Sequence, residues 1–350
     1  MRESSPAHLR VARGLLMVRA MLRTRSLTIV ALALLGLAAC GGKKSEGDKA
    51  KDTPTAGSAG SGSAAVAPAP TPSPAPPPPP PAPTYSPDAA KAAIAKLGDC
   101  VIPDNCEGYK TLVGFGPQAA PDLLAAIADP ASSKDTKEMA AAAVGALKQP
   151  DLGPKLVELG NAEQDSLVQD DIYGAAGESG GQATFDALIA AYAQAIGSVD
   201  DDRDIPLRKG LRAFPKESLA WAGTAIAAKG KGAPDPTGVA DLFTDSAQAA
   251  DLPAVVDALG KTKDVMARHR LAAKAIELGD TAHFDVFVTG LSSKDQYDRS
   301  DAANFLAQVA DKAPADLKPK LVELLQKGKA GDQGGLTAMG YDEALKKLGQ

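Results

Sequence analysis

Aromatic residues are scarce in this sequence. Phe, Trp and Tyr together make up 4% of its 350 residues, although 44% of the residues are hydrophobic. Ala, Leu and Val must therefore fill most of any core. Side chains of this size suit helices that pack closely side by side, whereas strands favour β-branched and aromatic residues. The composition therefore favours an all-α fold.

Histidine and cysteine are also rare, with three of each. Beyond the N-terminal region only His269 and His283 remain, and neither belongs to an H-E-x-x-H or His-x-x-x-His pattern, so a zinc hydrolase has little support. The C-x-x-C-H sequence that attaches haem is absent. We expect His269 to be exposed and His283 to be a turn residue. No catalytic, cofactor-binding or metal-binding residue is predicted, and we expect no enzymatic activity.

Positive charge is scarce outside the N-terminus. Residues 1–39 hold six Arg against one Glu, and residues 41–86 hold four Lys against three acidic residues. The total charge of −5 therefore leaves −11 for residues 87–350. Because phosphate binding needs a high density of Lys and Arg, nucleic acid is not an expected partner.

The apolar stretch Leu27–Ala39 has 13 residues, fewer than the roughly 20 that a membrane-spanning helix needs. It follows Arg23 and Arg25 and ends in the tetrapeptide Leu37-Ala38-Ala39-Cys40. A basic region, a short apolar region and small residues at the end are typical of a signal peptide. Residues 1–39 are therefore predicted to be one, with translation expected to start at Met21 (or Met17), since residues 1–20 would oversize its basic region.

The tetrapeptide that ends in Cys40 resembles the lipobox of bacterial lipoproteins, Leu-Ala/Ser-Gly/Ala-Cys, at all four positions. The resemblance implies that the Cys40 thiol takes a diacylglyceryl group and that cleavage occurs before Cys40. A further acyl chain on the freed amine would make the anchor stable. Gly41 stands where the inner-membrane retention signal has Asp, which implies the outer membrane, with the domain in the periplasm or on the surface. The alternatives are an ordinary signal peptide or an apolar segment that merely ends in Cys.

Residues 40–86 read as a tether. They consist mainly of Gly, Ser, Ala, Thr, Lys and Pro, and 13 of the 27 prolines lie between Pro54 and Pro87. Such a segment cannot bury enough apolar area to offset the entropy of ordering, so we expect disorder with a semi-rigid, extended proline-rich part.

Cys100 and Cys106 remain as a pair once Cys40 is lipidated, in an oxidising compartment. Six residues apart, they can close a small loop around Pro103-Asp104-Asn105, a turn-forming sequence. We predict a disulfide between them. Metal binding is less favoured, since no second Cys pair or neighbouring His completes a site.

One short phrase occurs twice: "DLGPKLVELG" at 151–160 and "DLKPKLVELL" at 316–325 agree in eight of their first nine letters. The separation of 165 is five times 33, and residues 175–189 resemble residues 274–288 at an offset of 99, or three times 33. Steps of 33 from Leu123 meet only apolar residues up to Leu321. The sequence therefore contains internal repeats with a period of 33.

Each period of 33 residues is predicted to form two helices. Residues 120–130 and 319–325 have apolar residues at helical spacing, and second helices are predicted within 135–148, 204–214, 266–279 and 298–310. A single pair cannot bury its apolar stripe, so the pairs must stack.

Repeats of this length occur in several families. Tetratricopeptide repeats need more aromatics, and the Thr-Pro-Leu-His of ankyrin repeats is missing. "AAGESGGQATFDALI" and "AAKAIELGDTAHFDVFV" resemble the short HEAT repeats of the phycobilisome-lyase type, over about 116–350, with a poor fit at 216–245 and 326–350. The resemblance implies a HEAT-like α-solenoid of about six to seven helix pairs, which we place within a domain at 87–350.

Two further patterns suggest chemistry only weakly. Residues 177–181 match G-x-S-x-G, but that motif works only between a strand and a helix, so a turn joining two repeats is favoured. The acidic run "VDDDRD" at 199–204 lacks the Gly and distal Glu of a calcium loop, and a solvated, helix-capping loop is favoured. Trp221 is expected in the core.

These features together predict a lipid-anchored, non-enzymatic scaffold of the cell envelope that binds an unidentified envelope protein through a surface of stacked helices. The alternatives are an enzyme accessory or lyase-like protein, as the family resemblance suggests, and a structural spacer between outer membrane and cell wall. No cofactor is expected.

Overall fold

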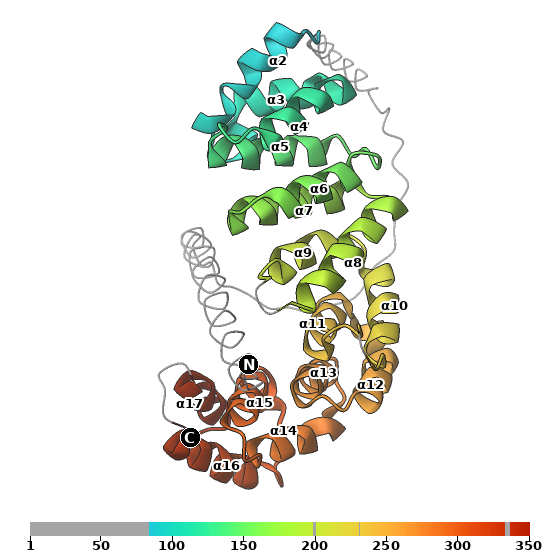
Figure 1. The fold of residues 1–350 in the computed structure, drawn as a ribbon. Coiled ribbons are helices and arrows are strands. Elements are labelled where there is room, and N and C mark those ends of the chain that lie inside the picture. Colours follow the sequence, from blue (N-terminus) through green and yellow to red (C-terminus); the bar gives the residue numbers. More distant parts are fainter. Residues whose placement is uncertain (1–83, 199–200, 231, 333–336) are drawn as a thin grey trace, which may run out of the picture. The chain divides into compact units, whose positions relative to one another are not determined.

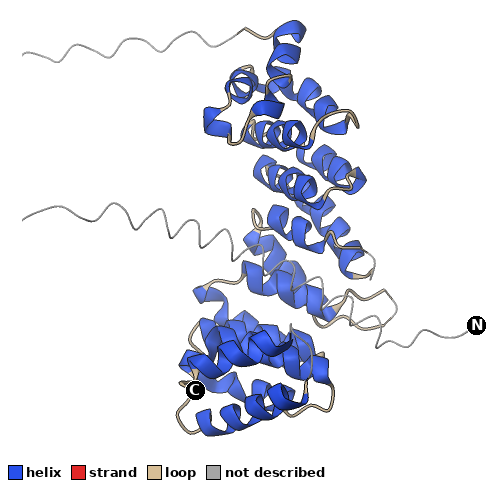
Figure 2. Cartoon of the chain, turned by 90° about the vertical axis from the view of Figure 1, so that its left-hand side faces the viewer, coloured by secondary structure: helices blue, strands red, loops and turns tan. Residues whose placement is uncertain are grey.

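The computed structural model describes residues 84–198, 201–230, 232–332 and 337–350. All regular structure in these residues is helical (Figures 1 and 2). The predicted signal peptide, Cys40 and the predicted tether up to residue 83 lie outside them. The α-helices are α2 (Pro87–Ile94), α3 (Glu107–Gly114), α4 (Ala120–Ala128), α5 (Lys134–Ala146), α6 (Gly153–Ala162), α7 (Ser166–Ser179), α8 (Gln182–Ile196), α9 (Asp204–Leu211), α10 (Pro215–Ala225), α11 (Pro236–Ser246), α12 (Leu252–Lys261), α13 (Val265–Glu277), α14 (Phe284–Leu291), α15 (Gln296–Val309), α16 (Lys318–Gly331) and α17 (Thr337–Lys347). Short 3₁₀ turns are η1 (Leu97–Asp99), η2 (Pro103–Asn105), η3 (Gly116–Ala119), η4 (Ala249–Asp251), η5 (Thr281–His283) and η6 (Ala310–Lys312).

Consecutive helices form pairs, each made of a first, even-numbered helix and a second, odd-numbered helix. Each pair packs on the next one along the chain: the second helix α7 contacts α5 and α9, and the first helix α8 contacts α6. Figure 1 shows this succession of pairs. The predicted HEAT-like α-solenoid is confirmed for the described residues. Seven pairs, α4/α5 to α16/α17, lie within 116–350, and α2/α3 forms an eighth pair before them.

The helix starts follow simple backbone chemistry. Pro121, Pro154, Pro253 and Pro319 each lie in the first turn of a first helix, where the missing N–H costs no hydrogen bond. Five second helices, α5, α7, α11, α13 and α15, begin with a Ser or Asp side chain that accepts a backbone N–H of the first turn. The capping residues are Ser133, Asp165, Asp235, Asp264 and Asp295. All four predicted second helices are confirmed, as α5, α9, α13 and α15.

The period of 33 is an average. The first helices α4, α6, α8, α10, α12, α14 and α16 begin at residues 120, 153, 182, 215, 252, 284 and 318, at intervals of 33, 29, 33, 37, 32 and 34 residues. The repeat that starts with α6 is four residues short, and the repeat that starts with α10 is four residues long. These two deviations cancel, so α6 and α16 still lie five average periods apart.

The apolar positions at steps of 33 stay in the core in spite of these deviations. Four residues are close to one helical turn of 3.6 residues, so a shift of four keeps a side chain on the same face. Leu123 is the fourth residue of α4 and Ile189 the eighth of α8, yet both are buried. Of the remaining positions Leu156, Ala222, Val255 and Leu321 are buried and Val288 is partly buried.

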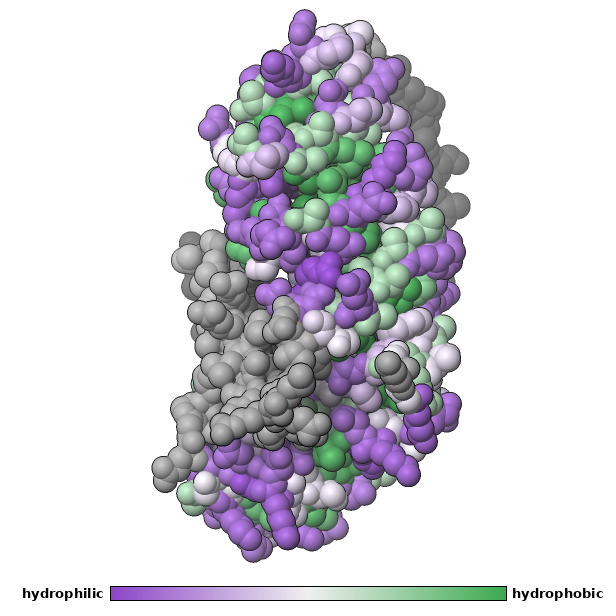
Figure 3. Space-filling view, viewed as in Figure 1, coloured by the Kyte–Doolittle hydropathy of each residue, from purple (hydrophilic) through white to green (hydrophobic). Residues whose placement is uncertain are grey.

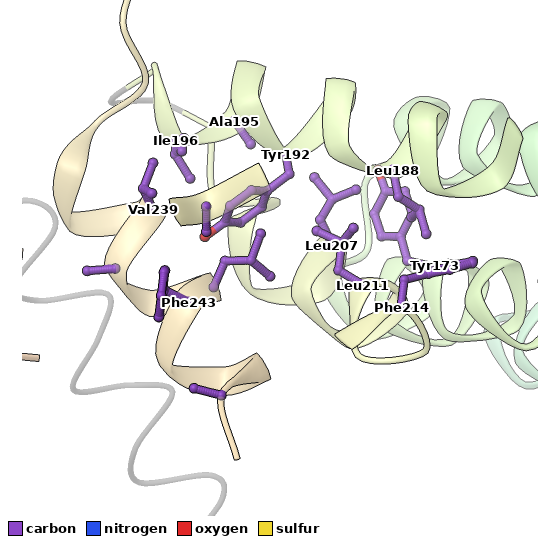
Figure 4. Packing of buried hydrophobic residues seen from close by; sticks show 14 of the residues in the cluster. Tyr173, Leu188, Tyr192, Ala195, Ile196, Leu207, Leu211, Phe214, Val239 and Phe243 are labelled. Atoms are coloured by element: carbon purple, nitrogen blue, oxygen red, sulfur yellow. The ribbon is translucent and has the colours of Figure 1, made fainter. Parts of the chain in front are cut away.

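The long repeat is where the sequence pattern fits poorly, at 216–245. Helix α10 buries only Ser218 and Ala222, and ten residues, 226–235, separate it from α11. The Tyr192 hydroxyl of α8 donates to the Gly238 carbonyl of α11 at 2.6 Å. Figure 4 shows Tyr192 beside Val239 and Phe243 of α11. Trp221 is partly buried and packs edge-on against the Tyr192 ring, with 6.2 Å between ring centroids.

Candidate binding surface

Charged side chains of the second helices pair with one another across neighbouring repeats. Basic residues of α9 face acidic residues of α7 and α11: Lys209 Nζ lies 2.8 Å from both Asp170 and Asp171, and Arg208 lies 3.0 Å from Asp245. Basic Arg270 of α13 likewise joins acidic residues of α11 and α15. These charges thus alternate in sign along the stack and hold neighbouring repeats in register. They are already paired within the chain, which leaves them less available for a partner.

The most buried of these groups is Arg270, whose Nε lies 2.6 Å from Asp241 and whose Nη1 lies 3.1 Å from Asp301. Burial by itself would lower the pKa of Arg270, but the two carboxylates outweigh burial and raise it. The guanidinium also lies over the Phe305 ring, 4.6 Å from its centroid. The network thus links three consecutive second helices, α11, α13 and α15, through one buried guanidinium.

His269 belongs to the same network, and the expectation that it would be exposed is wrong. It is only 1% exposed, its Nδ1 lies 2.8 Å from an oxygen of Asp301, and its ring stacks on Phe287. Its neighbours in sequence, Arg268 and Arg270, suggested a solvated helix face. The pairing with Asp301 on another repeat is what permits burial, and the local sequence does not show it. His283 lies in η5, as a turn residue should.

The G-x-S-x-G match is a turn between repeats, as expected. Ser179 is the last residue of α7, it is buried, and its hydroxyl donates to the Ala175 carbonyl at 3.0 Å. Gly180 and Gly181 have φ angles of 75° and 87° and form the connection to α8. A hydroxyl committed to its own helix is not placed as a nucleophile.

Residues 199 and 200 of the acidic run lie outside the described residues, and its described part, 201–204, is only partly a solvated loop. Asp201 accepts hydrogen bonds from the backbone N–H, Nε and Nη2 of Arg203, and these bonds lower the pKa of Asp201. Arg203 Nη1 also donates to Asn161 of the preceding pair. The N-cap of α9 is Arg203, and no side chain caps it, so the capping role expected for this run is wrong for α9.

A disulfide-closed loop connects α2 and α3. Cys100 and Cys106 are joined, with 5.3 Å between their Cα atoms. Cys106 is buried, and its Sγ accepts the Tyr109 N–H at the start of α3. The covalent bond and the buried anchor hold Val101 and Ile102 at the surface, where they are 90% and 48% exposed.

Exposed large apolar side chains of the described residues all lie on one edge of the stack. Because the two helices of each pair are antiparallel, the turns within pairs lie on one edge of the stack and the turns between pairs lie on the other edge. We call the first the intra-pair edge; it comprises the connections within pairs and the adjoining first turns of the second helices. The five exposed large apolar residues of the described chain are Val101, Ile102, Leu167, Val265 and Met339. The first two lie in the α2–α3 connection, and the others in the first turns of α7, α13 and α17.

The intra-pair edge is also acidic. In the described parts of the connections within pairs, 11 acidic residues stand against five basic ones, compared with five against three in the connections between pairs. Asp caps on second helices account for part of this excess, since a carboxylate at a helix N-terminus accepts backbone N–H groups and favours the helix dipole. An apolar and acidic edge suits a partner that offers apolar side chains among basic ones.

Elsewhere the visible surface is mixed. Figure 3 shows mainly hydrophilic residues, with hydrophobic residues between them, most clearly over the N-terminal pairs. No helix of the described ranges is long and apolar enough to cross a membrane. Those same ranges contain no group of three or more His, Cys, Asp or Glu side chains that could hold a metal ion.

Comparisons with known proteins show slight likeness in fold. No protein-family model matches the chain. No curated protein matches it. Among solved structures it is similar to human deoxyhypusine hydroxylase in complex with glycerol, at 15% identity and a TM-score of 0.28, covering 75% of this chain and 96% of the other. It is also similar to the complex of CpcE and CpcF of phycocyanin lyase from Nostoc sp. PCC7120, at 15% identity and a TM-score of 0.24, covering 76% and 96%. Likenesses this low say nothing about activity.

Proposed function

We propose that this chain is a lipid-anchored, non-enzymatic scaffold of the bacterial cell envelope that binds a protein partner along its intra-pair edge. One observation carries the proposal: every exposed large apolar side chain of the described residues lies on that edge. Single apolar residues scattered over a surface need no explanation, but their confinement to one edge does. Isolated apolar anchors within a polar surround are what binding interfaces typically use.

The arrangement along the stack supports an extended contact. The exposed residues belong to the first, third, sixth and eighth described pairs, so one partner would touch several repeats. Helical repeats suit this role, because each pair contacts only its neighbours and leaves its turns open. The paired charges of the second helices favour the edge over the helix faces as the place of contact.

Location in the envelope rests on the sequence around Cys40. The lipobox-like tetrapeptide supports acylation, and the proline-rich segment 40–86 supports a spacer that keeps the helical pairs away from the membrane. Mass spectrometry of the mature N-terminus is expected to show acylated Cys40, and Cys40→Ala is expected to move the chain out of the membrane fraction. A mature N-terminus at a residue other than Cys40, without an acyl group, would overturn the proposed lipid anchor but not the proposed binding role.

The binding role is tested by site-specific photo-crosslinking of the full chain in native membranes. A photoreactive residue replaces Leu167 or Val265 on the intra-pair edge, and Gln118 or Ala282, both exposed, on the opposite edge. We expect the same crosslinked protein from positions 167 and 265 and none from 118 and 282. Leu167→Asp with Val265→Asp should abolish capture without loss of fold, since both side chains are exposed. Equal labelling from both edges, or none from 167 and 265, would refute the proposal.

A further inference from the structure

The second helices pack closely on one another in two separate runs. Among the described helices, α3, α5, α7 and α9 pack on one another in turn, as do α11, α13, α15 and α17, whereas α9 and α11 do not pack closely. The first helices do not close this gap, because α8 packs closely on neither α10 nor α11. Helix α10 packs on α11. We therefore call α2–α9 the first stack and α10–α17 the second stack.

The helix backbones touch within the first stack but not at the junction between the stacks. A Cβ atom on Gly177 of α7 would meet the Gly210 carbonyl of α9, and one on Gly210 would meet the Tyr173 carbonyl of α7. Across the junction, a Cβ atom on Gly238 of α11 would meet the side chain of Ile196 from α8, at 2.6 Å, and its three nearest atoms all belong to that side chain. The two stacks therefore meet through side chains.

The polar links across the junction are also made by side chains. The Tyr192 hydroxyl of α8 donates to the Gly238 carbonyl of α11 at 2.6 Å. Asp245 of α11 lies 3.0 Å from Arg208 of α9 and 3.5 Å from Arg212, the residue that follows α9. Figure 4 shows apolar side chains of both stacks around the tyrosine. Side chains can adjust while they stay in contact, so an interface of this kind allows two packed bodies to turn by small sliding movements.

The junction also divides the exposed apolar residues of the intra-pair edge. Val101, Ile102 and Leu167 belong to the first stack, and Val265 and Met339 belong to the second. We infer that the junction is a joint about which the two stacks turn, and that a partner held by both stacks fixes the angle between them. A partner that contacts both stacks binds best at one angle and shifts the population toward it. The joint follows from the packing alone, whereas its fixing by a partner rests on the proposed binding role of the edge.

The joint is tested by pulsed electron paramagnetic resonance on the purified full chain. Spin labels carried by unnatural amino acids leave all three cysteines untouched. The labelled positions are exposed residues of first helices, two repeats apart: Ala183 with Ala254 across the junction, Ala125 with Ala183 within the first stack, and Ala254 with Gln326 within the second. We expect the distance distribution across the junction to be about twice as broad as the other two. Equal widths would overturn the joint.

A pair of hydroxyl deletions places the joint. Tyr192→Phe removes the bond to the Gly238 carbonyl and should broaden the distribution between Ala183 and Ala254 further. Tyr173→Phe is the matched control, because Tyr173 is equally buried but its hydroxyl bonds within its own pair, to Asn161. It should leave the distribution unchanged. No broadening in Tyr192→Phe, or equal broadening in both variants, would contradict a joint at this junction.

The effect of a partner is tested with the same labels in native membranes. The distribution between Ala183 and Ala254 should narrow to the width found within the stacks, and Leu167→Asp with Val265→Asp should restore the width of the purified chain. If no narrowing occurs although positions 167 and 265 crosslink a protein, the fixing by a partner is overturned and the scaffold stands. If those positions label nothing, the scaffold proposal fails together with the fixing, while the purified chain still decides whether the joint exists.

Discussion

The pairs α6/α7 and α16/α17 begin with nearly the same phrase and share one packing device. In each, a glycine of the first helix lies under a tyrosine ring of the second: a Cβ atom on Gly160 would come within 2.6 Å of Tyr173, and one on Gly328 within 2.6 Å of Tyr341. Both rings are fully buried. The close approach recurs, although the two glycines are not equivalent in the repeated phrase: Gly160 corresponds to Leu325, and Gly328 lies three residues beyond it.

The hydroxyl ends of these tyrosines differ. The Tyr173 hydroxyl donates to Oδ1 of Asn161, an exposed residue. The same oxygen accepts a hydrogen bond from Arg203 of the following pair. The Tyr341 hydroxyl donates to the buried carboxylate of Asp332. This carboxylate also accepts a hydrogen bond from Arg299 of α15, in the preceding pair. The polar link of α6/α7 joins it to the following pair, whereas the polar link of α16/α17 joins it to the preceding pair. The two pairs thus share a packing device but differ in the residue that accepts from the tyrosine, which is Asn161 in the last turn of α6 and Asp332 at the C-cap of α16.

The largest expected effect tests that difference in links. Asp332→Ala should destabilise the chain by about 3 kcal/mol, because it leaves Arg299 without its charge partner and a buried tyrosine hydroxyl without its acceptor. Arg299 is partly solvated, which keeps the loss at the lower end of the range for buried ion pairs. Asn161→Ala should cost about 1 kcal/mol, since water can replace an exposed acceptor. Urea unfolding of the two variants measures both, and equal losses would show that the two links are equivalent.

The shared packing device is tested by glycine substitution. Gly160→Ala and Gly328→Ala should each destabilise by about 1–3 kcal/mol, because the added methyl group must displace a buried ring. Gly260 of α12 is the control: no atom lies within 4 Å of the position that an added methyl group would take, so Gly260→Ala should gain up to about 1 kcal/mol from helix propensity alone. Unequal losses at 160 and 328 would break the parallel between the pairs.

The paired-helix fold could be predicted because its signals are local. Prolines such as Pro154 and Pro319 mark first-helix starts, and the apolar positions recur at helical spacing. The uneven repeat lengths are hidden in the sequence for a physical reason: a shift of four residues is close to one turn and leaves the buried face unchanged. The α2/α3 pair begins at residue 87, 33 residues before α4, so the period extends to it, although the resemblance to known repeats covers only about 116–350.

The candidate surface could not be predicted in the same way. Val101 and Ile102 lie between two cysteines with no periodic pattern around them, and Leu167 and Val265 look like ordinary apolar residues at helix starts. Their common edge appears only when the direction of every helix is known. The burial of His269 likewise depends on Asp301, 32 residues away on another repeat.

Alkaline pH should distinguish the two tyrosines. Burial raises the pKa of Tyr173 to about 12, against the opposing charge of Arg203. Burial and the hydrogen bond to Asp332 both raise the pKa of Tyr341, with Arg299 opposing them. A raised pKa means that the stabilisation is complete below about pH 10, the usual tyrosine value, and is lost as the pH rises through the folded-state pKa. Unfolding free energy should therefore fall above about pH 10.

Tyrosine-to-phenylalanine variants can show which tyrosine causes the loss of unfolding free energy at alkaline pH. Tyr341→Phe should flatten the alkaline loss more than Tyr173→Phe, because a hydrogen-bonded carboxylate, Asp332, adds to burial in raising the pKa of Tyr341, whereas Asp201 is the smallest of the causes that act on the pKa of Tyr173. Burial also raises the pKa of Tyr192, so the stability of both variants should still depend on pH in the alkaline range. Denaturation midpoints between pH 8 and 12 provide the measurement. A larger flattening from Tyr173→Phe would contradict the contrast between amide and carboxylate acceptors.

The smallest expected effect concerns a surface ion pair of the last pair of helices. Lys329 of α16 and Asp342 of α17 lie 2.5 Å apart, but their side chains are 47% and 57% exposed. Lys329→Ala should cost about 0.5 kcal/mol or less, because solvent screens the pair and the side chains, above all the long Lys329, lose freedom in forming it. The same variant in 0.5 M salt should be indistinguishable from the parent chain. A loss as large as that of Asp332→Ala would mean that α16 and α17 are held together by surface charges as much as by the buried Asp332.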